Sequence, residues 1–454
     1  MKIAFIHPDL GIGGAERLVV DAAVGLQSLG HEVTIYTSYH DKNHSFDETN
    51  DGTLKVIVEG NKIVPPKIFG RLAILCASLR QLHLTRNLIN SSVGNDYDVF
   101  IVDQLSICVP IIRFYLKGRI LFYCHFPDQL LTQRKSTLKK LYRVPFDWLE
   151  SWSTGIADVI LVNSKFTRSV FQKTFSGVKR LPEVIYPSVD TEQSGKALDS
   201  QATATFSVND DAKVILSINR FERKKNIELA LRAFAIVARD EKSSVLYLAG
   251  GYDPRVDENI GYLKELQSLS DELGLSHTTI FPSDTPKKEK VSTRVVFLPS
   301  VASSLKTYLL KNAHLLLYTP SYEHFGIVPL EAMVNGTPVL ATDTGGPLET
   351  VVNGVTGWNR PSDPTQWAKV IKYVVMVMSP EARELLSSAA KKRVKDHFST
   401  AKMAKEFEYY AIASTKVKRQ DIAHFGRFID FARAILVVLI VVLIVSIFNF
   451  LGHK

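Results

Sequence analysis

The pattern that most constrains this chain is a strand, a glycine-rich turn, a helix and a second strand, which opens the sequence and starts again in its second half. An apolar run at residues 2–7 precedes a helical apolar period at Ala15–Leu29 and another apolar run at His31–Thr37. Further apolar runs lie at Val99–Asp103, Ile120–His125 and Val159–Ser164, and the pattern restarts at Lys213–Arg220 and continues through VLYLAG, HLLLYTP and PVLAT. Strands that alternate with helices build parallel sheets. We therefore predict an α/β fold with two doubly wound parallel-sheet domains that face a ligand-binding cleft between them.

A polar stretch without periodicity separates the two halves and is predicted to be a linker. The other boundaries follow from its position. We expect an N-terminal Rossmann-like domain at 1–190, the linker at 191–211, a second domain at 212–398, a C-terminal helix with a basic juxtamembrane segment at 399–430, and a transmembrane anchor at 431–451.

The expected anchor rests on Ala434–Leu451, which carries no charge over 18 residues. As a helix this segment would span about 27 Å, close to the thickness of a bilayer core. A buried core helix is the alternative, but such a helix normally keeps a polar stripe. Basic residues gather on the N-terminal side of the segment, and no signal peptide opens the chain. We therefore expect the large domains on the cytosolic side of a membrane.

Composition narrows the class of protein. The chain is 46% apolar and 22% charged, which excludes a disordered protein. Of its net charge of +9, about +4 lies from Lys416 to the C-terminus, so no folded basic face that would suit a nucleic acid is expected. The three cysteines have no CxxC spacing, which indicates a reduced compartment and argues against a zinc site.

The first glycine-rich turn contains Gly13 and Gly14 but has Glu16 where a dinucleotide fingerprint needs its third glycine. The second strand also ends without an acidic residue that could bind a ribose. Binding of NAD is therefore not expected. Backbone amides at a helix start still suit an anion, with a simple tight turn as the alternative.

The segment Ser321–Glu349 has the strongest functional signal. Pro329 suits the start of a helix and Gly336 its end, which places Glu323 in the preceding loop and Glu331 in the first turn. A capping role for Glu331 is the alternative, but it does not explain a second carboxylate eight residues earlier. The amides expected to bind a phosphate or a sugar hydroxyl are those of Gly326, Ile327 and Val328.

These residues carry a resemblance to known enzymes. EHFGIVPLE resembles the E-x7-E signature of retaining glycosyltransferases of family 4, which have the GT-B fold, and the resemblance extends over about residues 1–410. RFERKK is similar to the Arg-x4-Lys pair of that family. The blocks YCHFPDQLLT and AGGYDPRVDEN closely resemble the endoplasmic-reticulum mannosyltransferases that add the second and third mannoses to the dolichol-linked precursor of N-glycans.

The resemblance implies GDP-mannose as donor, with no further cofactor and no metal. It implies Man-GlcNAc2-PP-dolichol as acceptor, with an α1,3 and then an α1,6 linkage formed at the cytosolic face of the endoplasmic-reticulum membrane. The first domain would face the acceptor and the second would bind the nucleotide sugar. Other transferases of the pathway are left open as partners. By this resemblance, Arg220, Lys225 and the amides of Gly13 and Gly14 would bind the diphosphate. Glu323 would bind the sugar hydroxyls, Glu331 the ribose, and Phe325 would belong to the donor site. His125 would lie at the reacting centre.

Four alternatives stay open at this point. The sequence DYD at Asp96–Asp98 matches the metal motif of other sugar transferases, although acidic residues also commonly start a strand. The acceptor could be another membrane lipid, and a GT-B-shaped scaffold without turnover is a different class of function. The basic and aromatic segments Pro65–Leu84 and Ser136–Trp152 fit either a membrane interface or ordinary amphipathic helices.

Overall fold

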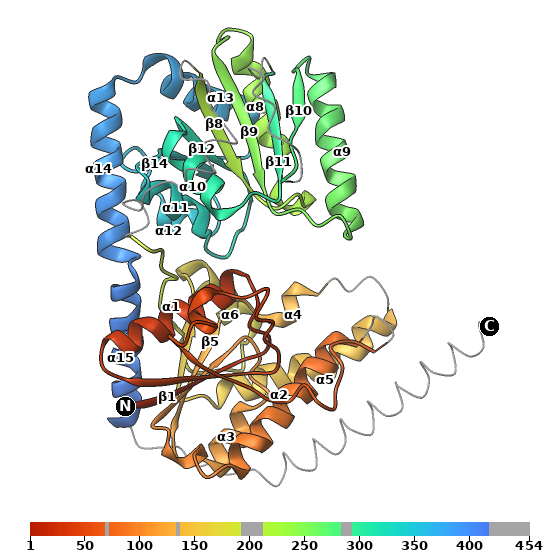
Figure 1. Ribbon diagram of the computed structural model, residues 1–454, viewed down its shortest axis with the longest axis vertical. Coiled ribbons are helices and arrows are strands. Elements are labelled where there is room, and N and C mark those ends of the chain that lie inside the picture. The colour runs from red at the N-terminus through yellow and green to blue at the C-terminus, as the bar shows by residue number, and fades with distance from the viewer. Residues whose placement is uncertain (69–71, 133–136, 192–211, 283–292, 417–454) are drawn as a thin grey trace, which may run out of the picture. The chain divides into compact units, whose positions relative to one another are not determined.

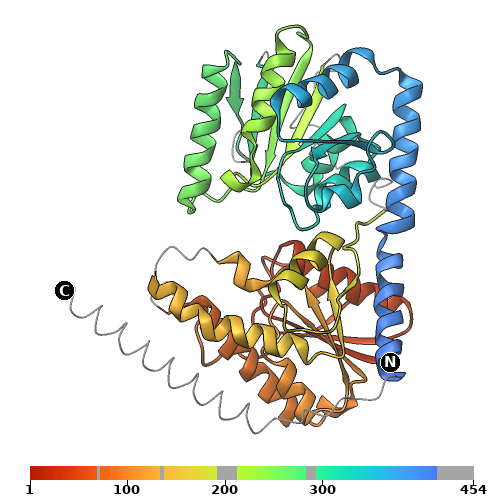
Figure 2. The same ribbon diagram turned by 180° about the vertical axis from the view of Figure 1, so that it is seen from behind.

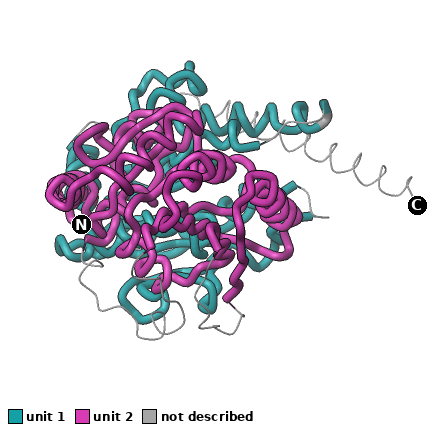
Figure 3. Tube along the Cα trace, turned by 90° about the horizontal axis from the view of Figure 1, so that it is seen from above, with its two compact units in different colours: residues 1–163, 167–185, 404–454 teal, residues 164–166, 186–403 magenta. Residues whose placement is uncertain are grey.

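A computed structural model describes residues 1–68, 72–132, 137–191, 212–282 and 293–416 (Figure 1). They fall into two compact units, coloured separately in Figure 3. Unit 1 comprises Met1–Asn163, Thr167–Ile185 and the residues from Ala404 on, and unit 2 comprises Ser164–Phe166 and Tyr186–Met403. Residues 192–211 of the expected linker lie outside the described residues. The end of the expected juxtamembrane segment and the whole expected anchor at 431–451 lie outside them as well.

Unit 1 is built on a seven-stranded sheet with the order β3-β2-β1-β4-β5-β6-β7, in which every pair is parallel. The strands expected from the apolar runs are confirmed. The shorter β3 and β7, which are only half-buried, were not predicted. The strands are β1 (Lys2–His7), β2 (Glu32–Thr37), β3 (Lys55–Val58), β4 (Val99–Asp103), β5 (Arg119–Cys124), β6 (Val159–Val162) and β7 (Glu183–Val184).

Helices cover both faces of this sheet, as Figure 2 shows from behind. Ala4 and Ile6 of β1 belong to a core with Leu84 of α2 and Ile112 of α3. Phe5, on the opposite face, packs against Phe407 of α15. The helices are α1 (Gly14–Ser28), α2 (Ala73–Asn90), α3 (Val109–Tyr115), α4 (Asp128–Leu131), α5 (Thr137–Gly155), α6 (Lys165–Thr174) and α15 (Thr400–Lys416), with short 3-10 turns at Asp47–Thr49 and Gly94–Asp96.

Unit 2 repeats this architecture with the strand order β10-β11-β9-β8-β12-β13-β14, again parallel throughout. Three of its strands, β10, β11 and β14, were not among those predicted. The strands are β8 (Lys213–Ile218), β9 (Ser244–Gly250), β10 (His277–Thr279), β11 (Val295–Pro299), β12 (Leu315–Tyr318), β13 (Val339–Thr342) and β14 (Gly357–Arg360).

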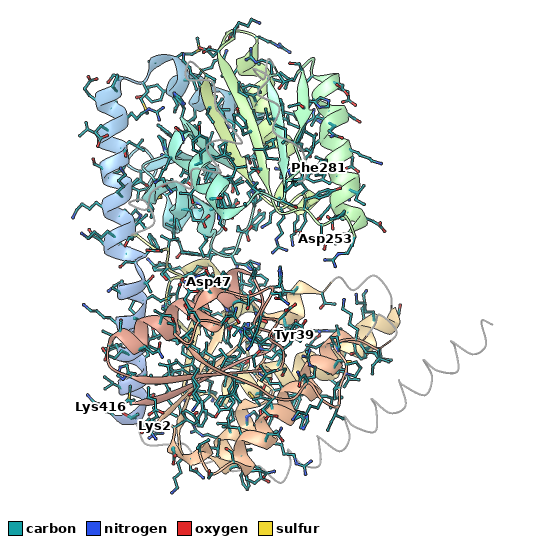
Figure 4. The ribbon with its side chains drawn as sticks, viewed as in Figure 1. Lys2, Tyr39, Asp47, Asp253, Phe281 and Lys416 are labelled. Carbon is teal, nitrogen blue, oxygen red and sulfur yellow. The ribbon has the colours of Figure 1, made fainter. Side chains whose placement is uncertain are left out.

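Alternate residues of the unit 2 strands face two different cores, as the two-residue period of a strand requires. Ile215 of β8 belongs to the core of α8, α9 and α13, whereas Val214 and Leu216 belong to the core of α10, α11 and α14. Side chains fill the space between sheet and helices (Figure 4). The helices are α8 (Glu228–Ala238), α9 (Asp257–Glu272), α10 (Ser303–Asn312), α11 (Ile327–Val334), α12 (Pro347–Thr350), α13 (Pro364–Lys372) and α14 (Pro380–His397), with a 3-10 turn η4 (Arg223–Lys225) and a π-helical turn at Tyr373–Val377.

Within the part of the chain that the structure describes, which ends at Lys416, no helix is both long enough and apolar enough to span a bilayer.

Candidate active site

Each sheet has a position where the strand order reverses, and ligands of doubly wound proteins bind outside the carboxyl ends of the strands at such a position. In unit 1 it lies between β1 and β4, and in unit 2 between β8 and β12. Arg220, Lys225 and Glu323 follow β8 and β12, and His125 follows β5, the neighbour of β4.

In unit 2 the expected cation and carboxylate are brought together. Lys225 lies in η4 after β8, and Glu323 lies in the loop after the neighbouring strand β12. Lys225 Nζ is 2.5 Å from Glu323 Oε2, and both side chains are largely buried. Burial acts to raise the pKa of Glu323, but the charge and hydrogen bond of Lys225 outweigh it and lower the pKa. Glu323 is therefore an ionised acceptor, suited to sugar hydroxyls or to the ammonium group itself.

Arg220 follows the same strand but is not part of this pair. Its side chain is 69% exposed, and its guanidinium lies 3.4 Å from Glu222. Glu222 also contacts Lys224, at 2.9 Å. Arg220 therefore keeps most of its donors toward solvent, where a diphosphate could accept from them. Glu222, which restrains the two exposed cations, was not predicted.

The loop that carries Glu323 is held by a glycine pair that sequence reasoning also missed. The amide of Gly346 donates to the carbonyl oxygen of Glu323 at 2.7 Å. A Cβ atom on Gly346 would lie 2.3 Å from Phe325 Cα, so any other residue would displace this loop. The Phe325 side chain is buried against Tyr186 and Phe398. A contact of Phe325 with a donor would therefore come from its backbone.

The helix predicted after this loop is α11, and Gly326 precedes its first residue, Ile327. Its first amides, including that of Val328, have no partner within the helix. Gly336, with a φ of 78°, follows the end of the helix as predicted. One placement was wrong. Glu331 is the fifth helical residue and begins the second turn, because the helix starts two residues before Pro329.

Glu331 has a partner that the sequence did not reveal. Lys306 of α10 lies with its Nζ 2.6 Å from Glu331 Oε1. Glu331 Oε2 is buried and accepts no hydrogen bond from the described residues. One carboxylate oxygen is thus oriented by a lysine, while the second is an acceptor without a partner among the described residues.

In unit 1 the glycine-rich turn adopts the expected place before a helix. Gly13 is the cap of α1 and Gly14 its first residue. The carboxylate of Glu16, in the first turn, covers Gly13, because a Cβ there would lie 2.2 Å from Oε2. The Glu16 carboxylate therefore lies at the helix start where backbone amides were expected to bind an anion. Its charge is offset by His7, whose Nε2 is 3.9 Å from Glu16 Oε1.

His125, the predicted residue at the reacting centre, follows β5 and contacts a buried carboxylate. Its Nε2 is 2.8 Å from Asp103 Oδ1, and Asp103 Oδ2 is 2.8 Å from His7 Nδ1. Neither Asp103 nor His7 was predicted as a site residue. Both end strands that read as apolar runs, and a charged residue at the carboxyl end of such a run is the signal that could have identified them.

The pKa values of His7 and Asp103 show that each side chain stabilises the charged form of the other. Burial acts to lower the pKa of His7, but its hydrogen bond to Asp103 and the nearby carboxylate of Glu16 outweigh burial and raise the pKa to about 9. Burial acts to raise the pKa of Asp103, but the contacts with His125 and His7 lower it to about 2. His7 and Asp103 therefore form a buried ion pair at neutral pH.

The residues after His125 are held by α5. Glu150 accepts hydrogen bonds from the amides of Asp128 and Gln129, at 2.7 and 3.1 Å. Arg143 contacts the Asp128 carboxylate at 2.6 Å. Burial, followed by the charge of Asp128, raises the pKa of Glu150 to about 7. The short helix α4 after His125 is thus tied to α5 by charged groups.

The alternative metal motif at Asp96–Asp98 has a local role in the structure. Asp98 accepts a hydrogen bond from the amide of Lys2 at 2.8 Å, at the amino end of the sheet. This position is the entry of β4, opposite the edge that carries Asp103.

Comparisons with known proteins agree with this arrangement. Residues 12–193 match the family described as Glycosyltransferase Family 4, and residues 201–393 match Glycosyl transferases group 1. A sucrose-phosphate synthase from Thermosynechococcus elongatus is similar in fold, with a TM-score of 0.69 at 20% identity over 91% of this chain and 100% of that one. The Anabaena protein Alr3699/HepE in complex with UDP gives a TM-score of 0.66 at 19% identity, again over 91% of this chain and 100% of that one. The fold is therefore GT-B.

Relatives of higher identity share one name, alpha-1,3/1,6-mannosyltransferase ALG2. The Kluyveromyces lactis protein is 52% identical over 424 residues, covering 90% of this chain and 84% of that protein. The Rhizomucor pusillus protein is 53% identical over 380 residues, covering 82% and 83%. The Schizosaccharomyces pombe protein is 50% identical over 413 residues, covering 90% and 80%. This chain therefore belongs to the ALG2 family of alpha-1,3/1,6-mannosyltransferases.

Proposed function

We propose that this protein transfers mannose from GDP-mannose to Man-GlcNAc2-PP-dolichol, first in an α1,3 and then in an α1,6 linkage, during assembly of the N-glycan precursor. The observation that carries the proposal is 52% identity over 90% of the chain with a protein named for both linkages. The polar groups at the two strand-order reversals support it, because they supply acceptors for a sugar and donors for a diphosphate.

The donor site of the proposal lies at the carboxyl edge of the unit 2 sheet. Lys225 and Arg220 bind the diphosphate, and the first amides of α11 add uncharged donors. Glu323 binds hydroxyls of the mannose, and Glu331 binds the ribose with its carboxylate oriented by Lys306. The Lys225–Glu323 contact of 2.5 Å supports this assignment, because it brings a cation and a carboxylate together at one strand edge.

The reaction needs stabilisation of a departing diphosphate while the anomeric carbon becomes oxocarbenium-like. Donors that are already oriented toward the developing charge supply most of such stabilisation. In the proposed route the acceptor attacks from the side of the leaving group, and the departing phosphate oxygen takes the acceptor proton. This route needs no pair of catalytic carboxylates, unlike a glycosidase.

Attachment to the membrane is part of the proposal, because the acceptor is a lipid. Helix α5 supports attachment to a membrane, because a charged side chain of this helix is buried while several of its apolar side chains are exposed. Arg143 is buried and ion-paired, whereas apolar side chains of the same helix are exposed beside two exposed lysines. Such a face suits lipid headgroups better than a protein core. The exposed residues are Leu141, Val144, Trp148, Lys139 and Lys140.

A direct assay tests the proposed reaction. Purified full-length protein is incubated with radiolabelled GDP-mannose and a synthetic lipid-linked Man-GlcNAc2, and the products are digested with linkage-specific mannosidases. The proposal predicts two added mannoses, one in each linkage. No transfer to this acceptor, or transfer only to a phosphatidylinositol-linked glycan, would contradict it.

A second experiment tests the proposed location, which is the endoplasmic-reticulum membrane with the catalytic units in the cytosol. Protease added to sealed microsomes should digest both units. Their protection would contradict the proposed orientation.

A further inference from the structure

The carboxylate of Asp103 lies between two imidazoles from the strands on either side of it. β4 ends at Asp103 and pairs with β1, which ends at His7, and with β5, which ends one residue before His125. Both nitrogen–oxygen distances are 2.8 Å, and they involve different oxygens of the carboxylate. Each oxygen of Asp103 therefore has its own imidazole partner.

Burial separates the roles of the three side chains. The side chains of His7 and Asp103 are 0% and 1% exposed, whereas that of His125 is 19% exposed. Of the three, His125 is the one that a substrate can contact. Asp103 can influence a bound sugar mainly through the imidazole that it contacts.

A carboxylate close to Nε2 favours a proton on that nitrogen and restricts rotation of the ring. The other ring nitrogen, Nδ1, makes no hydrogen bond with the residues described here. A sugar hydroxyl both donates and accepts, so it can pair with Nδ1 in either protonation state of the ring.

We propose that Asp103, supported from behind by His7, is a positioning residue that holds His125 with Nδ1 presented to a hydroxyl of the reacting sugar. This inference rests on the proposed mannosyl transfer. His7 contributes because a buried carboxylate with a single partner would be costly. The second imidazole therefore keeps Asp103 ionised and in place when substrate binds to His125.

A double-mutant cycle in the full-length enzyme tests the proposal. Asp103→Asn keeps the shape of the side chain and removes its charge, and it is combined with His125→Ala. Alone, Asp103→Asn should lower kcat by about 10–100-fold, by analogy with the loss of carboxylates that orient histidines at metal sites. The KM for GDP-mannose should stay within about twofold. In the His125→Ala background the same change should lower kcat by less than about twofold further.

Asp98→Asn is the matched control, because Asp98 flanks the same strand at its opposite end and its role as an acceptor for the Lys2 amide survives in asparagine. It should leave kcat unchanged. An equal cost of Asp103→Asn in both backgrounds would overturn the proposal, since Asp103 would then act independently of His125.

If Asp103→Asn fails to fold, His7→Gln takes its place in the cycle. It should lower kcat when His125 is present and not when His125 is alanine, and an equal loss in both backgrounds would again overturn the proposal. A wild-type enzyme that transfers no mannose would contradict the proposed function instead. The cycle would then be measured by urea unfolding, where an absence of coupling between Asp103→Asn and His125→Ala would overturn the positioning role.

Discussion

The two strand-order reversals are built on the same sheet topology but bury their charged side chains to different degrees. In unit 1 the charged groups His7 and Asp103 end strands and are buried with each other. In unit 2 the charged groups lie after the strands, where the Lys225–Glu323 pair is largely buried and Arg220 is mostly exposed. Buried pairs are oriented before a ligand arrives, which suits the placement of a reacting group. Exposed cations suit a ligand that brings its own negative charge.

From this comparison we expect the largest loss of mannosyl transfer when Lys225 of unit 2 is removed, because its partner Glu323 is largely buried. Lys225→Ala should lower mannosyl transfer by about 10²–10³-fold, because the diphosphate loses a charged donor and Glu323 loses its partner. Transfer assays with purified variants measure the loss.

The matched control is Lys224→Ala, at the adjacent residue, whose side chain is 69% exposed and contacts Glu222. It should keep nearly full activity. Equal losses in the two variants, with unchanged thermal unfolding, would contradict the specific role of Lys225.

A smaller effect is expected at Glu331. Glu331→Gln removes the charge that Lys306 and a ribose diol would share, and a hydrogen bond with a charged group is worth about 1.5–3 kcal/mol. The KM for GDP-mannose should rise by about tenfold or more, with a smaller change in kcat. Glu228→Gln, on the exposed side of α8, serves as control. An unchanged KM in Glu331→Gln would remove Glu331 from the donor site.

In unit 1 the comparison predicts an effect on stability rather than on donor binding. The folded pKa of His7, about 9, lies above its ordinary value of 6.5. The stabilisation is therefore complete below pH 6.5 and is lost as the pH rises through about 9. It amounts to the order of 3 kcal/mol, so the Tm should fall by several degrees.

The window from pH 7 to 8.5 separates this effect from that of Glu150 below it and from that of Cys108 and Cys124 above it, because burial raises the pKa of both thiols above their ordinary value of 9. A carboxyl whose pKa is raised to about 7 destabilises the fold as the pH rises from its ordinary value toward 7, which is below the window for His7. The groups that face His7 are Asp103 and Glu16. His7→Gln should abolish the fall in Tm between pH 7 and 8.5, and a fall of the same size over this window in the variant would contradict the assignment.

The smallest expected effect is that of a chelator. Transfer should continue in excess EDTA, because Asp98, the second acid of the possible metal motif, is used at the entry of β4. Inhibition that added Mn²⁺ or Mg²⁺ reverses would instead assign a metal to Asp96–Asp98.

Much of the fold could be predicted because buried parallel strands are continuous apolar runs. Val99–Asp103 and Arg119–Cys124 are such runs and were located to within a residue or two. The polar β10, with the sequence HTT, and β14, with GWNR, carry no such signal and are strands because of their neighbours.

The site was predicted where its residues are close in sequence and missed where they are distant. Glu323 and Glu331 were found from their spacing around one helix start. His7 and Asp103 are 96 residues apart, and Lys306 reaches Glu331 from another helix, 25 residues away. Such pairs depend on which strands and helices become neighbours, and strand order cannot be read from local periodicity.

We propose that the two reversals have separate roles, with unit 2 binding the donor nucleotide and unit 1 acting on turnover. The most direct test is the dissociation constant of GDP, measured by calorimetry beside kcat, for Lys225→Ala and His125→Ala. We expect weaker GDP binding in Lys225→Ala, and in His125→Ala a strongly reduced kcat with unchanged GDP binding. Loss of GDP binding in His125→Ala as large as that in Lys225→Ala would contradict it.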